Sequence, residues 1–187
     1  GKYRAHNYES GCVQVDATHG FTTVELRDAA SSNRAIDGDV CFVEVLGSAT
    51  ETEGAVTGRV VGIVRRNWRP YVAALETSVD NESSESSEEG DSRVEQAQPS
   101  SSRATHVFVV PYDRRVPKVR VRLSAEAEAA CSGARLVVSV DAWDAGARHP
   151  DGHVVRVLGA IGELQTEVDT VLVENEISCP PFTAALL

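Results

Sequence analysis

The sequence contains no methionine, even at position 1, and only four cysteines. These cysteines (Cys12, Cys41, Cys131, Cys179) lie far apart, form no Cys-x-x-Cys pair and follow no signal-like N-terminus, which predicts reduced thiols and excludes a secreted disulfide framework. No apolar run approaches the roughly 18 residues that a membrane span requires, so we expect no membrane partner. Because the last residues form an apolar run and the first is not methionine, we interpret both ends as cut points in a longer protein.

The net charge of -10 argues against a nucleic-acid partner until it is divided along the chain. Residues 1–75 and 105–124 carry 13 Lys/Arg and 10 Asp/Glu, residues 76–104 carry 2 and 8, and residues 125–187 carry 3 and 10. This division predicts that a basic surface belongs to the first part of the chain alone.

Residues 76–104 are rich in Ser, Glu and Asp and have only two valines, so they cannot bury enough apolar surface to fold. We expect a disordered acidic insertion that loops out of a domain. Its serines stand among acidic residues, where phosphorylation would add further negative charge.

The rest of the chain has the pattern of a mainly β protein. Before the insertion, short strand-like runs with glycine-containing turns predict a five-stranded OB or cold-shock barrel with a short helical turn near residues 28–36. After it, two further strand-like runs at 106–111 and 116–123 complete a first domain of residues 1–124. A second, smaller barrel at 125–187 has helices at 124–130 and 164–174, the latter with Leu164, Val168, Val171 and Leu172 at helical spacing. The predicted strands of the first barrel are Lys2–Asn7, Cys12–Asp16, Thr22–Arg27, Val40–Leu46 and Gly58–Arg65, and those of the second are Arg135–Ala142 and His153–Ala160.

Two basic segments are the candidate RNA-binding residues. The first interleaves arginines with aromatic rings, a composition suited to pairing phosphates and stacking unpaired bases. In the second, three cations alternate with Val119 and Val121, which places them on one face of a strand about 7 Å apart. Either segment can equally be structural, with the rings packed in a core and the cations solvated or paired. The candidates are Arg65, Arg66, Asn67, Trp68, Arg69 and Tyr71 in the first segment and Arg114, Arg115, Lys118, Arg120 and Arg122 in the second.

Motifs for catalysis or metal binding are weak. His149 and His153 have His-x3-His spacing, but the Pro-Asp-Gly between them favours a turn. Glycine pairs such as Gly58 and Gly62 lack the Lys-Ser/Thr of a phosphate-binding loop. We therefore expect no catalytic residues, no metal site and no cofactor in this chain.

Four segments in order resemble the tandem cold-shock domains of the RNase II/RNase R family, especially those of the eukaryotic exosome's 3'-to-5' exoribonuclease subunit. They are residues 33–40, 58–71, 111–121 and 152–159, the last followed by Thr166-Glu167. Gly11–Val15 departs from the family pattern because it replaces the usual aromatic-rich strand. The aromatic residues left near the mouth of the barrel are Tyr3, Tyr8, Phe21 and Phe108, any of which can instead belong to the core.

The resemblance implies that the chain guides single-stranded RNA, 3' end first, into a Mg²⁺-dependent catalytic domain beginning after Leu187. It also implies a PIN-type domain before Gly1, exosome core subunits as partners, and a location in the nucleus or nucleolus and also the cytoplasm. The alternative hypothesis is a structural module that braces the nuclease and contacts exosome subunits with little RNA binding of its own.

Overall fold

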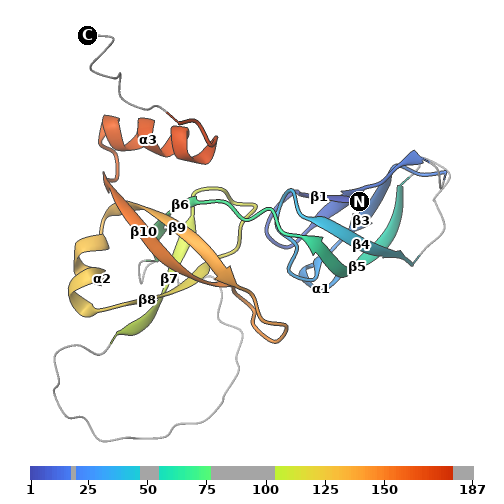
Figure 1. Cartoon of the computed structure of the whole chain (residues 1–187), viewed down its shortest axis with the longest axis horizontal. Coiled ribbons are helices and arrows are strands. Elements are labelled where there is room, and N and C mark those ends of the chain that lie inside the picture. The colour runs from blue at the N-terminus through green and yellow to red at the C-terminus, as the bar shows by residue number, and fades with distance from the viewer. Residues whose placement is uncertain (18–19, 47–54, 77–103, 179–187) are drawn as a thin grey trace, which may run out of the picture.

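The computed structural model describes residues 1–17, 20–46, 55–76 and 104–178. These residues form two closed five-stranded barrels, which lie side by side and are joined by one extended segment, residues 66–70 (Figure 1). The predicted fold class, two small OB-like barrels with short helices, is confirmed. The proposed disorder of the insertion concerns residues that, apart from 76 and 104, lie outside the described part of the chain.

The first barrel contains β1 (Lys2–Ala5), β2 (Gly11–Gln14), β3 (Thr23–Leu26), β4 (Val40–Val45) and β5 (Ala55–Arg65), in the spatial order β1-β2-β3-β5-β4. Helix α1 (Ala29–Ser32) connects β3 to β4, and the Asp28 side chain caps it by accepting a hydrogen bond from the Ser31 amide at 2.7 Å. Alternating inward residues such as Tyr3, Val13 and Val24, each at most 1% exposed, fill the interior. This alternation is the expected consequence of a strand with one buried face.

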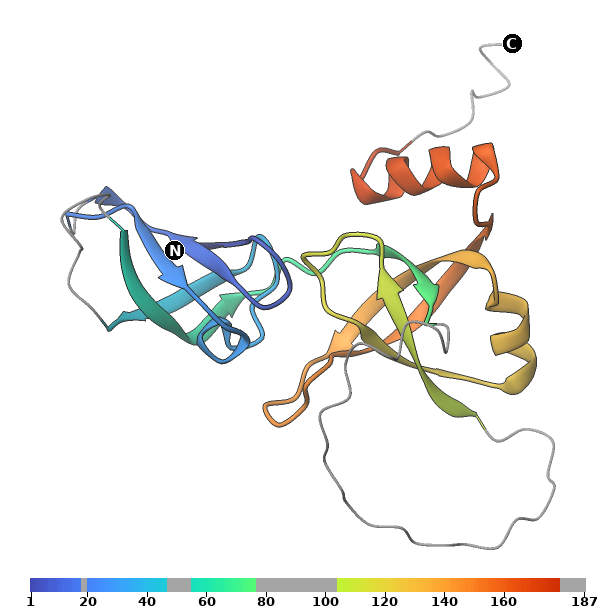
Figure 2. The same ribbon diagram turned by 180° about the vertical axis from the view of Figure 1, so that it is seen from behind.

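The second barrel contains β6 (Tyr71–Leu75), β7 (Thr105–Pro111), β8 (Val119–Leu123), β9 (Ala134–Ala142) and β10 (Asp151–Ala160), in the order β10-β8-β7-β6-β9. Helix α2 (Ala125–Cys131) follows β8, with Ser124 as its N-cap. Helix α3 (Leu164–Glu174) follows β10 and lies across one end of this barrel, with its C-terminal end toward the segment that joins the two barrels (Figure 2).

The predicted domain boundary at residue 124 is wrong, because β6, β7 and β8 belong to the second barrel. Tyr71 in β6 pairs with Val138 in β9, and Val109, Val119 and Leu136 share one buried core. Along the chain these strands follow the first barrel directly. They belong to the second barrel because their backbone hydrogen bonds are made with its strands. The predicted strands also omit β6, because Tyr71 at its start belongs to the basic and aromatic segment predicted to bind RNA.

The corrected boundary also removes the predicted division of charge between the domains. Residues 1–70 carry 8 Lys/Arg and 9 Asp/Glu, whereas residues 71–75 and 105–178 together carry 8 and 11. Neither barrel is therefore basic as a whole. Any basic surface must arise from where the side chains lie, not from the composition of one domain.

Helix α3 packs with the face opposite to the one that its apolar spacing predicts. Thr166 and Thr170 are 2% and 1% exposed against the barrel, whereas Leu164 and Val171 are 81% and 54% exposed. Thr166 approaches Gly159 so closely that a side chain there would collide with its hydroxyl, so the contact requires small groups on both sides. The apolar face of α3 consequently points away from the barrel.

Candidate nucleic-acid interface

The segment between the barrels is held by a buried carboxylate, that of Asp39. Its side chain is fully buried and accepts hydrogen bonds from the amides of Asn67 and Ile36, at 2.6 and 3.0 Å. Arg66 forms an ion pair with it at 3.0 Å and also donates to the Arg34 carbonyl. Because a buried charge is tolerated only when it is paired and hydrogen-bonded, these contacts fix Arg66 and Asn67 in place.

The next residues of the predicted motif join helix α3 to the second barrel. Arg69 forms an ion pair with Glu174 at 2.8 Å, and Glu174 also accepts the Val72 amide at 2.6 Å. The prediction that Tyr71 stacks a base is wrong, because its side chain is 2% exposed and belongs to the core. Burial raises the pKa of Tyr71 to about 12. Trp68 packs on the same core, with the Arg66 guanidinium 4.8 Å from its ring centroid.

The second basic segment is also largely paired within the protein. Val119 and Val121 point into the barrel as predicted. Lys118 forms an ion pair with Glu76, and Arg120 forms one with Asp151 through two contacts at 2.5 and 2.8 Å. Arg115 contacts Asp113 at 2.8 Å and reaches Asp37 of the first barrel at 3.3 Å. Most of the predicted RNA-binding cations therefore also hold the protein together.

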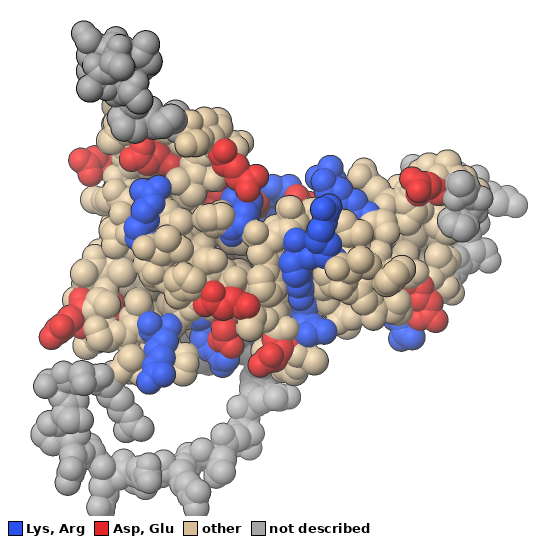
Figure 3. All heavy atoms as spheres, in the orientation of Figure 1, with Lys and Arg blue, Asp and Glu red and all other residues tan. Residues whose placement is uncertain are grey.

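Three predicted cations, Arg65, Arg114 and Arg122, are exposed and form no ion pair with any described residue. In the space-filling view, lysine and arginine side chains gather where the two barrels meet, whereas acidic side chains gather near α3 (Figure 3). The junction is thus the basic region of this face, although both barrels carry more acidic than basic residues.

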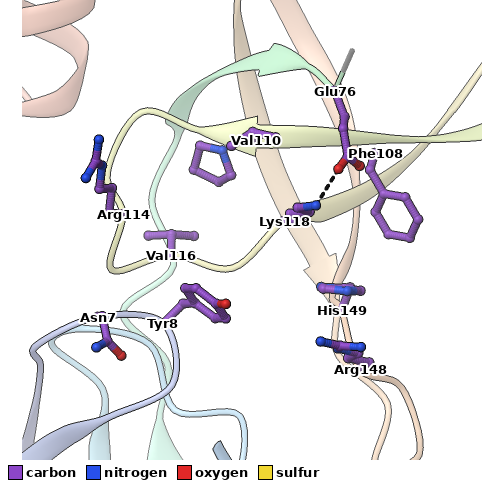
Figure 4. Close-up of a pocket in the computed structure, with 11 residues that line it drawn as sticks. Asn7, Tyr8, Glu76, Phe108, Val110, Arg114, Val116, Lys118, Arg148 and His149 are labelled. Carbon is purple, nitrogen blue, oxygen red and sulfur yellow. Dashed lines mark hydrogen bonds and ion pairs between the residues drawn. The ribbon is translucent and has the colours of Figure 1, made fainter. Parts of the chain in front are cut away.

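A pocket of about 460 Å³ opens at this junction (Figure 4). The first barrel contributes Tyr8 from the loop between β1 and β2, where the Asn7 side-chain oxygen accepts the Glu9 and Ser10 amides, each at 2.8 Å. The second barrel contributes Phe108 from the outer face of β7. The other lining residues are Glu76, Val110, Pro111, Arg114, Val116, Lys118, Arg148 and His149.

The pocket combines exposed aromatic rings with cations. Tyr8 is 53% exposed and Phe108 is 36% exposed, and the Phe108 ring meets the His149 ring edge-to-face with centroids 5.1 Å apart. Burial lowers the pKa of His149, and the positive charges of Arg148 and Lys118 lower it further, which favours the neutral imidazole. Aromatic faces beside cations are the groups with which proteins hold unpaired bases and their phosphates.

The sequence identified only part of this pocket. Tyr8 and Phe108 were among the aromatic candidates, and Arg114 and Lys118 among the cations, but Arg148 and His149 were not. Both lie on the loop between β9 and β10, which the strand pairing of the closed barrel places beside the pocket. The other two aromatic candidates lie in or against the first core, Tyr3 fully buried and Phe21 partly.

Metal and membrane sites have little support in the described residues. No three His, Cys, Asp or Glu side chains there are grouped to hold a metal ion, and His153 instead contacts Asp141 at 2.9 Å. No helix in the described ranges is long and apolar enough to cross a membrane. Cys12, Cys41 and Cys131 are buried free thiols, whereas Cys179 lies outside the described residues.

Comparison with known proteins relates both the sequence and the fold to exoribonucleases. Residues 106–176 match the family model of the Dis3-like cold-shock domain 2. The exosome complex exonuclease dis3 of Schizosaccharomyces pombe is 30% identical over 217 aligned positions, covering 97% of this chain and 20% of the relative. The human exosome complex exonuclease RRP44 is 37% identical over 131 residues, covering 70% of this chain and 11% of the relative. The chain thus spans a fifth or less of the length of these relatives.

Solved structures agree on the fold. Mycoplasma genitalium RNase R, determined with ribose-methylated single-stranded RNA, has a TM-score of 0.65 at 14% identity, covering 97% of this chain and 25% of that one. The yeast pseudonuclease Ssd1 has a TM-score of 0.67 at 19% identity, covering 94% and 24%. The chain has two closed barrels in succession, and the second of them matches cold-shock domain 2. The resemblance to the tandem cold-shock domains of the RNase II/RNase R family is thereby confirmed, and residues 106–176 belong to the family of the Dis3-like cold-shock domain 2.

Proposed function

We propose that the two barrels bind single-stranded RNA at their junction and guide it, 3' end first, into the catalytic domain of an RNase II-type exoribonuclease. The observation that carries this proposal is the junction pocket, in which Tyr8 and Phe108 stand beside Arg114 and Arg148. A duplex buries its base faces in the stack, whereas a single strand can offer them to these rings. The fragment itself is proposed to bind RNA without cutting it. Catalysis, with its Mg²⁺, is assigned to a domain outside this chain, in an exosome-associated protein of the nucleus, nucleolus and cytoplasm.

The structure changes which residues we expect to carry binding. Arg66, Arg69 and Arg115 are engaged with Asp39, Glu174 and Asp113, so we propose that they act mainly by holding the junction in shape. Asn67, Trp68 and Tyr71 belong to the same structural group. Direct contact with RNA is assigned to Tyr8, Phe108, Arg114, Arg148 and Lys118, with Arg65, Arg120 and Arg122 as further phosphate contacts.

Fluorescence anisotropy with a labelled ten-nucleotide single strand and a duplex of the same length tests this function. Affinity measured at several salt concentrations gives the number of phosphate contacts, since each contact in a single strand contributes about -0.7 to the slope of log K against log salt. We expect Arg114→Ala and Arg148→Ala each to make that slope shallower by roughly this amount. The matched control is Arg59→Ala, which removes an exposed cation paired with Glu44 in the first barrel.

Equal binding of duplex and single strand, or equal effects of Arg59→Ala and the two pocket variants, would contradict the proposed site. Absence of binding at low salt would contradict binding by the fragment and favour the alternative function.

That alternative, a module that braces the nuclease and contacts exosome subunits, is supported by the outward apolar face of α3. Leu164, Val168 and Val171 are 81%, 44% and 54% exposed, and clustered exposed apolar side chains commonly mark contact surfaces. If this function dominates, the double variant Leu164→Lys and Val171→Lys leaves RNA affinity unchanged but lowers recovery of exosome subunits with the full-length parent. Unchanged recovery would count against it.

A further inference from the structure

A second hollow lies on the other side of the turn that carries Arg114. It is lined by Arg69, Tyr112, Asp113, Arg114, Arg115, Glu174 and Asn175. Arg114 lines both this hollow and the junction pocket, so the two sites meet at one side chain. The tip of the turn, Tyr112 and Arg114, therefore borders a continuous surface leading from the junction toward α3.

The turn is held firmly by hydrogen bonds that involve neither the Tyr112 ring nor the Arg114 guanidinium. The Asp113 side chain accepts the amide and the guanidinium of Arg115, with distances of 2.8 to 3.0 Å, and Arg69 lies 3.6 Å away. The Tyr112 amide donates to the Val72 carbonyl at 2.7 Å, which anchors the turn to β6.

The Tyr112 ring is positioned as a stacking surface. Arg135 lies over it, 5.2 Å from the ring centroid, and Glu167 holds that guanidinium at 3.3 Å. The Arg135 side chain is 18% exposed, whereas Tyr112 remains 54% exposed. A cation fixed against one face of the ring restrains its orientation, and about half of the residue remains exposed.

The charge around Tyr112 favours a phosphate. The acidic side chains of this hollow, Asp113 and Glu174, are 15% and 10% exposed and are paired with Arg115 and Arg69. Arg114 has no such partner among the described residues, so its positive charge determines what the hollow attracts.

We propose that Tyr112 is a second base-stacking site, reached by an RNA strand that leaves the junction pocket and crosses Arg114. This inference rests on the proposed RNA-binding function and extends it to a footprint of more than one nucleotide. Its ligand is a base of any identity in a single strand, because the ring offers a stacking face and the cation offers a phosphate contact, neither of which reads a base edge.

Two RNA probes separate this inference from the proposed function. In a Tyr112→Ala background, uridine monophosphate followed by ligand-detected NMR reports the junction pocket alone, whereas a labelled ten-nucleotide strand followed by anisotropy reports both sites in the unmutated protein. We expect Tyr112→Ala to retain binding of the mononucleotide at the junction pocket and to weaken binding of the long strand by about 5-fold or more, the lower end of what one stacked base contributes. Tyr112→Phe keeps the ring and should keep the affinity, whereas Tyr8→Ala should weaken both probes.

The two variants separate failure of the second stacking site from failure of the proposed function. If Tyr112→Ala binds the long strand like the wild type while Tyr8→Ala does not, the second site is wrong and the proposed function survives. If neither variant changes either probe, both fail. Photocrosslinking with 4-thiouridine in the long strand gives a second measurement on the unmutated protein: an adduct at Tyr112 supports the site, and adducts confined to the junction pocket overturn it.

Discussion

Replacement of Asp39 should destabilise the junction between the barrels more than any exposed ion pair does. Its carboxylate is fully buried and is shared by the Arg66 guanidinium and the amides of Ile36 and Asn67, at 2.6 to 3.0 Å. In Asp39→Ala all three donors lose their acceptor, and Arg66, whose side chain is 27% exposed, keeps a charge without a counter-charge.

The size of the effect follows from burial. Removal of one partner of a buried ion pair typically costs about 3–5 kcal/mol. Because water can partly reach Arg66, we expect the free energy of unfolding to fall by about 3 kcal/mol. The matched control is Glu44→Ala, whose partner Arg59 is 57% exposed in a pair at 2.7 Å. Exposed pairs contribute about 0–1 kcal/mol, so the control should change stability by less than 1 kcal/mol.

Urea denaturation followed by tryptophan fluorescence and circular dichroism measures the difference. Trp68, beside Arg66, and Trp143 both pack on the core of the second barrel, so tryptophan emission reports the loss of this packing. Coincident transitions by the two probes justify one free energy of unfolding. An equal loss of stability in Asp39→Ala and Glu44→Ala would refute the reasoning that the buried carboxylate holds the barrels together.

Three further predictions concern pH, thiol reactivity and backbone conformation. Burial alone would raise the pKa of Asp113, but hydrogen bonds from Arg115 outweigh burial and lower that pKa. This carboxylate therefore stabilises the fold above its unfolded pKa of about 3.9, and the contribution is lost as pH falls through the folded pKa. In urea titrations Asp113→Asn should flatten the loss of stability below pH 4, and an unchanged profile would count against this assignment. Burial raises the pKa of Cys41 to about 11, so we expect iodoacetamide at pH 8 to label this thiol only after unfolding, and mass spectrometry of the native protein showing rapid labelling would contradict this. Gly38 has a φ of 90°, and an added Cβ would collide with the Asn67 side-chain amide. Gly38→Ala should therefore lower the free energy of unfolding by at least about 1 kcal/mol, as measured in thermal melts. The control is Gly146→Ala, because an added Cβ there meets nothing within 4 Å.

The local pattern of residues was sufficient to predict most of the strands and the family. In β8, Val119 and Val121 alternate with cations, and that alternation alone predicts which side chains point inward. The family resemblance rested on short segments of contiguous residues, and the comparisons confirm it. These features depend on neighbours in the chain, so they can be read without knowing the fold.

The partners of each strand and each arginine were decided only by the tertiary structure. Tyr71 pairs with Val138 and Arg69 with Glu174, and the second pair is separated by 105 residues. Periodicity cannot show which of two adjacent barrels receives a strand, because both offer the same backbone hydrogen bonds. It also cannot show whether a cation faces water or a distant carboxylate, and for that reason the densest basic motif became the structural link between the barrels. The pocket beside it became the candidate RNA site because closure of the second barrel brings the loop of Arg148 to Tyr8 of the first.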